Sequence, residues 1–138
     1  RDMLLPIADI LTPNLPEAAA LLGEPEARNR EDMLCQARAL RGLGARTIYL
    51  KGGHLKSDES PDLLLTSEAE HWLESRRINT KNTHGTGCSL SASIAANKAG
   101  GVSDIDTAVA AKRYITKAIA AAHRLQVGHG HGPIYHFQ

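Results

Sequence analysis

The chain has 138 residues and a formal net charge of +1, with 42% hydrophobic and 22% charged residues. This composition is typical of a folded globular protein and excludes a disordered chain, and the near-zero net charge argues against a nucleic-acid-binding protein, whose affinity needs a basic surplus. Two cysteines are too few for a disulfide scaffold, and no apolar run approaches the roughly 20 residues that span a bilayer. We therefore expect a cytoplasmic protein with neither nucleic-acid nor membrane partners.

Hydrophobic periodicity and turn residues predict strands that alternate with helices. Pro13 ends the first strand, Asn14 is placed to cap the helix that follows, and Gly23 is placed to end that helix. In chain order, the predicted elements are a strand over 7–11, helices over 15–22 and 30–43, a strand over 47–51, a hairpin of strands 62–66 and 70–76, and helices over 89–99 and 103–125.

The last predicted helix begins at Ser103-Asp104-Ile105-Asp106, a variant of the capping box. Its many alanines, like those of the helix before it, indicate close helix packing. Its larger apolar residues are expected to share one buried stripe, which consists of Ile105, Val109, Ile115, Ile119 and Ala122.

Alternating strands and helices predict a layered α/β fold with a mostly parallel sheet. The predicted strands are fewer than the five or six of an average sheet, and the chain begins at Arg1 without a methionine. We therefore expect these residues to be part of a longer doubly wound domain.

The strongest chemical signal is the segment Gly85-Thr86-Gly87-Cys88, directly before a predicted helix. Two glycines let backbone N–H groups converge, and a helix start adds partial positive charge, so the segment could bind a phosphate. A tight turn before a helix would give the same pattern, although Lys81, Thr83 and His84 beside it favour a binding role. Cys88 is either a thiolate stabilised by the helix start, acting as a base or nucleophile, or a small buried apolar residue.

Further polar residues lie at the ends of two predicted strands, where ligands bind in parallel sheets. Lys51 precedes Gly52-Gly53 and either supplies a point charge to a phosphate or is a solvated lysine. Asn14 can serve as a helix cap. Glu17, in the first turn of that helix, either complements the helix dipole or holds a hydrated Mg²⁺, a cation that takes few protein carboxylates.

The C-terminal segment carries three histidines among glycines and a proline. Imidazole suits Zn²⁺, but no cysteine or carboxylate completes a ligand set, so we interpret the segment as a flexible turn. The histidines are His129, His131 and His136.

Four segments together resemble the ribokinase-like small-molecule kinases, and more closely the hydroxymethylpyrimidine/phosphomethylpyrimidine kinases of thiamine biosynthesis. The most specific is Thr-His-Gly-Thr-Gly-Cys (83–88), because sugar kinases carry Asp where Cys88 stands. The resemblance covers essentially the whole chain but only the C-terminal half of the family's length. The matching segments are Leu-Thr-Pro-Asn-Leu-Pro-Glu (11–17), Leu-Lys-Gly-Gly-His (50–54), residues 80–92 and residues 127–137.

The resemblance implies a ribokinase-like α/β/α fold, of which residues 1–138 form the nucleotide- and phosphate-binding part of a single kinase domain. It implies ATP and Mg²⁺ as cofactors, and a pyrimidine alcohol or its phosphate as acceptor. One departure is Asn79, where many relatives carry Asp.

The resemblance also implies roles for single residues. Cys88 would be the catalytic base, beside an anion hole formed by Gly85, Thr86 and Gly87. Lys51 would lie near the nucleotide phosphates. The remaining positions implied are Asn14, Lys81 and Thr83 for the nucleotide, and Glu17 for the metal ion.

Two alternatives remain open from the sequence. One is a pyridoxal kinase of the same branch, which shares the Gly-Thr-Gly-Cys loop. The other is an inactive fragment, since an incomplete sheet exposes an edge and a hydrophobic face. We expect the isolated chain to lack kinase activity and to self-associate into a homo-oligomer through that edge.

Overall fold

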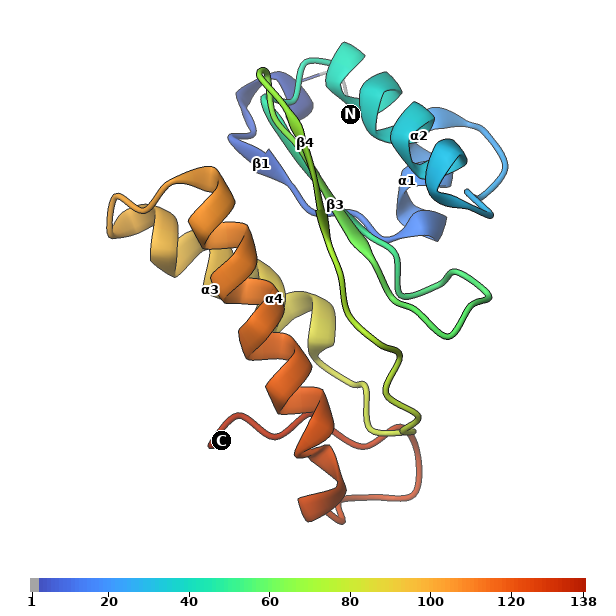
Figure 1. Ribbon diagram of the computed structural model, residues 1–138, viewed down its shortest axis with the longest axis vertical. Helices are drawn as coiled ribbons and strands as arrows, with labels where there is room; N and C mark the ends of the chain where they lie inside the picture. The colour runs from blue at the N-terminus through green and yellow to red at the C-terminus, as the bar shows by residue number, and fades with distance from the viewer. Residues whose placement is uncertain (1–2) are drawn as a thin grey trace. The chain divides into compact units, whose positions relative to one another are not determined.

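The computed structural model describes residues 3–138, which form two compact units, one ending at Arg77 and the other beginning at Ile78 (Figure 1). None of the helices within residues 3–138 is long and apolar enough to cross a membrane. The first unit contains η1 (Leu5–Ile7), β1 (Ile10–Leu11), α1 (Leu15–Leu22), α2 (Arg30–Gly42), β2 (Thr47–Lys51), β3 (Asp62–Leu65) and β4 (Glu70–Leu73), and the second contains α3 (Thr86–Ala99), α4 (Asp104–Ala120) and η2 (Ala122–Arg124).

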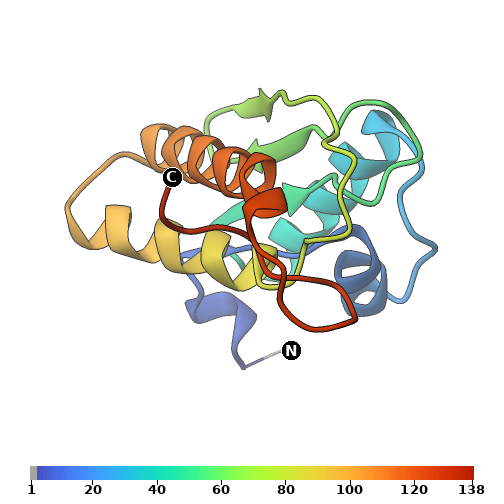
Figure 2. The same ribbon diagram turned by 90° about the horizontal axis from the view of Figure 1, so that it is seen from below.

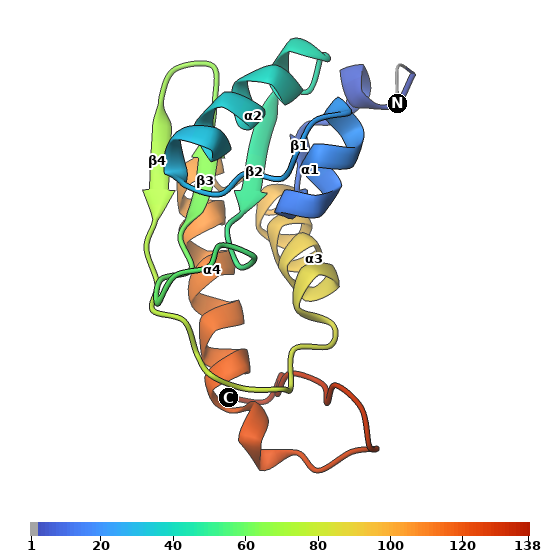
Figure 3. The same ribbon diagram turned by 90° about the vertical axis from the view of Figure 1, so that its right-hand side faces the viewer.

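The first unit is a four-stranded sheet in the order β1-β2-β3-β4, with α1 and α2 on one face (Figure 3). Because successive side chains of a strand point to opposite faces, alternate residues of β2 and β3 form the core with these helices. The largest of these core residues are Ile48, Leu50, Leu63 and Leu65 from the strands and Met33 and Leu40 from α2.

The sheet is mixed, and the predicted hairpin is confirmed in the antiparallel pair of β3 and β4. β1 pairs with β2 in parallel, whereas β2, β3 and β4 pair antiparallel. The short connections 52–61 and 66–69 allow only an antiparallel return, since a parallel crossover needs a dozen or more residues.

The first predicted strand is shorter than expected. Residues 7–11 were expected to be extended, but Ile7 ends the 3₁₀ turn η1 and is 75% exposed, so only Ile10–Leu11 form β1. Pro6 accounts for the difference, because its fixed φ suits the first turn of a helix. The predictions of α1 and β2 are confirmed residue for residue.

In the second unit, α3 and α4 pack side by side and an extended tail follows η2 (Figure 2). α3 begins at Thr86, three residues before the predicted start, so Thr86, Gly87 and Cys88 lie in its first turn and not in a loop. Gly85 is the N-cap, with φ of +84°, a left-handed conformation that favours glycine.

The buried face of α4 differs from the predicted stripe. Ile115 and Ala122 are buried as expected, but Ile105 and Val109 are 41% and 47% exposed. Small side chains occupy most of the buried face because they let helices approach closely. The buried residues of α4 are Thr107, Ala108, Ala111, Ile115 and Ala118.

Tyr49 and Asp62 form a buried polar pair on the sheet. The Tyr49 hydroxyl donates to Asp62 Oδ2 at 2.9 Å, and the two residues are 0% and 6% exposed. Burial, and then the neighbouring Asp62 carboxylate, raise the pKa of Tyr49 far above its ordinary value. The folded state therefore favours the neutral Tyr49 phenol.

This pair predicts a loss of stability at alkaline pH. In the unfolded chain Tyr49 ionises near pH 10, so above about pH 10 the folded state binds more protons than the unfolded state, and the free energy of unfolding falls as pH rises. Urea unfolding should show that the advantage of wild type over Tyr49→Phe shrinks above that pH. Tyr49 is one of three tyrosines. Because Tyr49 should not ionise in the folded protein, Tyr49→Phe should leave the tyrosinate absorbance of the folded protein at alkaline pH unchanged. A lower tyrosinate absorbance in the variant would contradict the prediction.

Candidate active site

Asn14, Glu17 and Lys51 are brought together at the carboxyl ends of β1 and β2. The Lys51 N–H donates to Pro13 O at 2.9 Å, and Asn14 and Lys51 form a parallel bridge beyond the strands. The Lys51 ammonium lies 3.6 Å from Glu17 Oε2, and the lysine side chain is only 17% exposed. Parallel strands that end at one edge thus place a cation beside a carboxylate.

Asn14 and Glu17 also form a complete capping box for α1. Glu17 N–H donates to Asn14 Oδ1, and Asn14 N–H donates to Glu17 Oε2, both at 2.7 Å. Of the two carboxylate oxygens, Oε2 is used by the cap and by Lys51, whereas Oε1 has no partner among residues 3–138. The Glu17 side chain is 56% exposed, so Oε1 is open to a hydrated cation.

The turn after Lys51 is tightly packed. Gly52 N–H donates to Asp62 Oδ1 at 2.9 Å, and Gly52 O accepts from Leu55 N–H at 3.0 Å. A Cβ atom at Gly52 would collide with the carbonyl oxygen of Pro61. Glycine is therefore required here for space.

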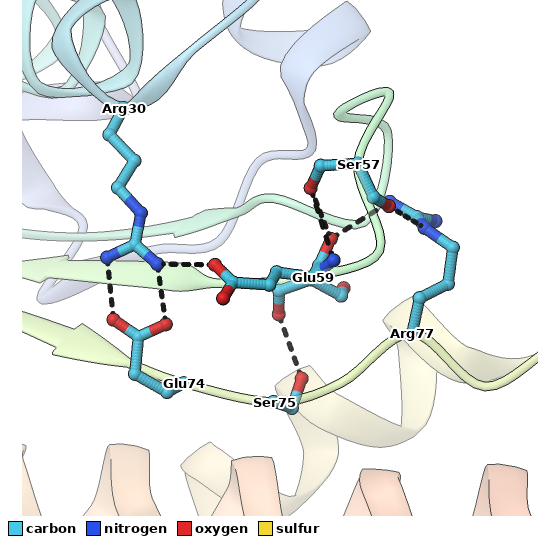
Figure 4. A network of polar contacts seen from close by, with 7 residues as sticks. Arg30, Ser57, Glu59, Glu74, Ser75 and Arg77 are labelled. Atoms are coloured by element: carbon cyan, nitrogen blue, oxygen red, sulfur yellow. Dashed lines mark hydrogen bonds and ion pairs between the residues drawn. The ribbon is translucent and has the colours of Figure 1, made fainter.

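Arg77 fastens the connection that follows the turn, as Figure 4 shows in part. Its guanidinium donates to Ser57 O and Gly53 O, each at 2.8 Å, and also to the carbonyls of Leu55 and Glu59. Arg30 holds the other side of the connection, since it binds Glu74 with both Nη atoms and Glu59 at 2.9 Å. These arginines make the connection 52–61 a defined structure.

The residues predicted around the helix start lie in the second unit. Thr86 donates through Oγ1 to Thr83 O at 2.7 Å and through its N–H to the same oxygen at 3.3 Å. The N–H groups of Gly87 and Cys88 have no acceptor within the described chain. Because they open a 14-residue helix, these donors point where a phosphate oxygen can bind.

Cys88 is an exposed free cysteine. The alternative that it is a small buried apolar residue is therefore wrong. Its thiol lies in the first turn of α3.

The C-terminal tail supports the segment before α3. His84 N–H donates to Gly132 O at 3.0 Å, and Ile134 N–H donates to His84 O at 3.3 Å. Asn82 donates through Nδ2 to Ala122 O at 2.8 Å, and Gly132 packs so closely on Asn82 that a Cβ atom would collide with it. The helix start is thus held by contacts with residues about 40 to 50 positions later.

Lys81 and Thr83 contribute backbone carbonyls to this support. Lys81 O lies 3.2 Å from His131 Nδ1, within hydrogen-bond distance. The Lys81 and Thr83 side chains are exposed. His136 contacts a different group, the Tyr114 hydroxyl, at 2.8 Å. No cluster of three or more histidine, cysteine or acidic side chains that could hold a metal occurs within residues 3–138.

The predicted site residues therefore fall into two groups, one in each unit. The sequence did not point to the buried Asp62 or to Arg77, because each was assigned only to a strand of the predicted hairpin or its continuation. A signal for Asp62 exists: it is a lone acidic residue at the start of the apolar run Leu63–Leu65.

Comparison with known proteins identifies the family. The family model described as phosphomethylpyrimidine kinase matches residues 1–135. The chain belongs to the phosphomethylpyrimidine kinase family. It is 50% identical over 137 residues to the hydroxymethylpyrimidine/phosphomethylpyrimidine kinase of Escherichia coli. The aligned region covers 99% of this chain and 52% of that protein. The chain thus spans about half the length of this relative.

Solved structures confirm the ribokinase-like α/β fold that the family resemblance implied. Bacillus subtilis pyridoxal kinase, solved with ADP, superposes with a TM-score of 0.91 at 37% identity, covering 98% of this chain and 50% of that one. A phosphomethylpyrimidine kinase from Clostridium difficile superposes with a TM-score of 0.69 at 33% identity, covering 84% and 45%.

The packing at Gly52 in this family member predicts that Gly52→Ala is destabilising. The new Cβ must displace the Pro61 backbone, and overpacking of this kind costs about 2 kcal/mol or more of unfolding free energy. Gly53→Ala is the matched control, because the nearest atom to its Cβ is Ser60 Oγ at 3.6 Å. Urea denaturation of both variants measures the difference; equal stability of the two would contradict the packing argument.

Proposed function

We propose that the full-length polypeptide carrying this chain is an ATP-dependent kinase that phosphorylates hydroxymethylpyrimidine and its monophosphate in thiamine diphosphate biosynthesis. The main support is the 50% identity to the Escherichia coli kinase across 99% of this chain. The arrangement of charges and free amides in both groups of site residues is consistent with phosphoryl transfer, which depends on positioning and charge neutralisation.

The start of α3 is suited to the charge that develops on the transferred phosphoryl group. The N–H groups of Gly87 and Cys88 are unpaired within the described chain, and the helix dipole adds to their positive field. In this proposal, Gly85, Thr86 and Gly87 form the anion hole. Lys81 and Thr83 flank it on the nucleotide side.

Lys51 and Glu17 are suited to the nucleotide phosphates and their metal ion. The Lys51 ammonium supplies a point charge, and the capping box holds the Glu17 carboxylate in place with Oε1 free. A hydrated Mg²⁺ fits this donor set, because Mg²⁺ keeps several waters and takes one or two carboxylates. When bound, the ion would neutralise phosphate charge; Asn14 orients Glu17 through the cap.

Cys88 is proposed to act on the acceptor. An alcohol acceptor must lose its proton during transfer, and a thiolate in the first turn of α3 can accept it. A phosphate acceptor is already ionised, so there Cys88 would bind or orient the acceptor.

We further propose that residues 1–138 form the nucleotide- and phosphate-binding part of one kinase domain that acts in the cytoplasm. The relatives are about twice as long, so the acceptor contacts are assigned to the rest of the polypeptide. Copies of the protein are proposed to self-associate.

Pyridoxal phosphorylation is the second candidate activity. The observation that favours it is the TM-score of 0.91 to Staphylococcus aureus pyridoxal kinase, solved with AMP-PCP and pyridoxal, at 32% identity. The identity to that protein is lower than the 50% to the Escherichia coli kinase, which places pyridoxal second.

An acceptor comparison tests the proposal. The full-length polypeptide is incubated with ATP, Mg²⁺ and one of three acceptors: hydroxymethylpyrimidine, its monophosphate, or pyridoxal. We expect kcat/KM for both pyrimidines to exceed that for pyridoxal by at least about tenfold, since a site that hydrogen-bonds one heterocycle leaves polar groups unpaired with another. Phosphorylated products are identified by mass spectrometry.

The 138-residue chain alone is the control and is expected to give no product. Higher kcat/KM for pyridoxal would establish the second candidate. No transfer to any of the three acceptors by the full-length polypeptide would refute both.

Replacing Cys88 separates its two proposed roles. Cys88→Ala should lower kcat about 100-fold with the alcohol acceptor, the usual contribution of a general base, and much less with the monophosphate. Cys35→Ala is the matched control, because Cys35 is also an exposed free cysteine and lies on α2. Full turnover of the alcohol by Cys88→Ala would exclude a base role.

A further inference from the structure

Asp62 is a buried carboxylate that none of the roles above uses. It is 6% exposed and lies at the first position of β3, opposite Lys51 in the antiparallel register. A buried charge is costly unless hydrogen bonds compensate it. Asp62 lies next to the proposed phosphate-binding Lys51, so its hydrogen bonds can affect the position of that lysine.

The Asp62 carboxylate binds the chain on both sides of Lys51. Oδ2 accepts from the Tyr49 hydroxyl and Oδ1 accepts from the Gly52 N–H, each at 2.9 Å. Tyr49 is two residues before Lys51 and Gly52 is one residue after it. Two charge-assisted hydrogen bonds from one buried group therefore fix where β2 ends and where the Gly52 turn begins.

Neighbouring contacts leave this turn little freedom. Pro61 occupies the space where a side chain at Gly52 would lie, and Arg77 holds Gly53 O at 2.8 Å. On the other side, the Lys51 N–H is bound to Pro13 O at 2.9 Å. A change in the Gly52 backbone would therefore be transmitted to Lys51.

We propose that Asp62 is a positioning residue for phosphoryl transfer: its buried carboxylate, hydrogen-bonded to Tyr49 and Gly52, fixes Lys51 beside Glu17. Asp62 acts through Lys51 and touches neither substrate. The inference rests on the proposed function, because it takes Lys51 to bind the nucleotide phosphates. Removing the carboxylate lets the turn relax and moves the ammonium, and small misplacements of such groups lower rates strongly.

The test is a double-mutant cycle in the full-length polypeptide. Asp62→Ala should lower kcat/KM for ATP by about 10- to 100-fold. In a Lys51→Met background the same substitution should change kcat/KM less than about twofold, because residues that act as a unit are not additive. Asp62→Asn should retain most of the activity, since its amide oxygen still accepts from Gly52 and its NH₂ donates to the Tyr49 oxygen.

Gln36→Ala is the control for general loss of stability. Gln36 is 4% exposed in α2 and donates to Pro25 O at 2.7 Å, so its replacement also removes a buried hydrogen bond, but one whose partner lies outside the turn. Native-state hydrogen exchange of the Gly52 amide gives a readout without catalysis. Asp62→Ala should accelerate this exchange, whereas Gln36→Ala should leave it unchanged.

The outcomes separate the inference from the proposed function. If wild type is active and Lys51→Met lowers kcat/KM, but Asp62→Ala has its full effect in the Lys51→Met background, the inference alone is wrong. An Asp62→Ala effect no larger than that of Gln36→Ala also overturns it. If wild type transfers no phosphate, the proposed function fails; if Lys51→Met is fully active, the lysine assignment and the inference fail together.

Discussion

The parallel pairing of β1 with β2 is the constraint on which the first group of site residues depends. Although β1 has two residues, its hydrogen bonds to β2 continue on both sides, from Ala8 O to Pro13 O. Pro13 cannot donate a backbone hydrogen bond, yet its carbonyl accepts from Lys51 and sets the last step of the register. Without this step, α1 and the Lys51 turn would each form locally, but Glu17 and Lys51 would not meet. The geometry follows from a backbone contact and not from an attraction between the two charges.

Structural and chemical roles coincide at Glu17. The sequence offered two readings of this residue, complementing the helix dipole or holding a metal ion. The capping box uses one carboxylate oxygen and leaves the other open, so the two readings are compatible. A capped carboxylate also loses little further conformational freedom when it binds a ligand, which is the advantage of preorganised groups. The same logic applies to Lys51, whose side chain is mostly covered before any phosphate arrives.

Local signals in the sequence were sufficient for most elements, and long-range contacts explain what they missed. α1 was predicted residue for residue because Asn14 and Gly23 mark its two ends, and β2 because β-forming residues stop at a glycine pair. The α4 stripe was wrong because helix packing selected small residues over isoleucine. Asp62 was missed because its partners lie 13 and 10 residues earlier, Tyr49 on β2 and Gly52 in the turn that follows β2. Periodicity identifies a strand position but not a hydrogen bond across the sheet.

The start of α3 differs from the other α-helix starts in residues 3–138. At α1, α2 and α4, a side chain of the N-cap residue accepts a hydrogen bond from one of the first backbone amides. The N-cap residues are Asn14, Asn29 and Ser103, respectively. Gly85 has no side chain to offer, so α3 forgoes a cap of the kind worth about 1 kcal/mol. The Thr86 N–H is bound to Thr83 O, but the next two amides, of Gly87 and Cys88, have no acceptor within the described chain. This is the arrangement expected of a helix whose first turn binds an external anion. It also explains why the start of α3 was predicted too late from the sequence. The usual capping residue is missing there, because in the proposed phosphate-binding role the first amides must stay open to the anion.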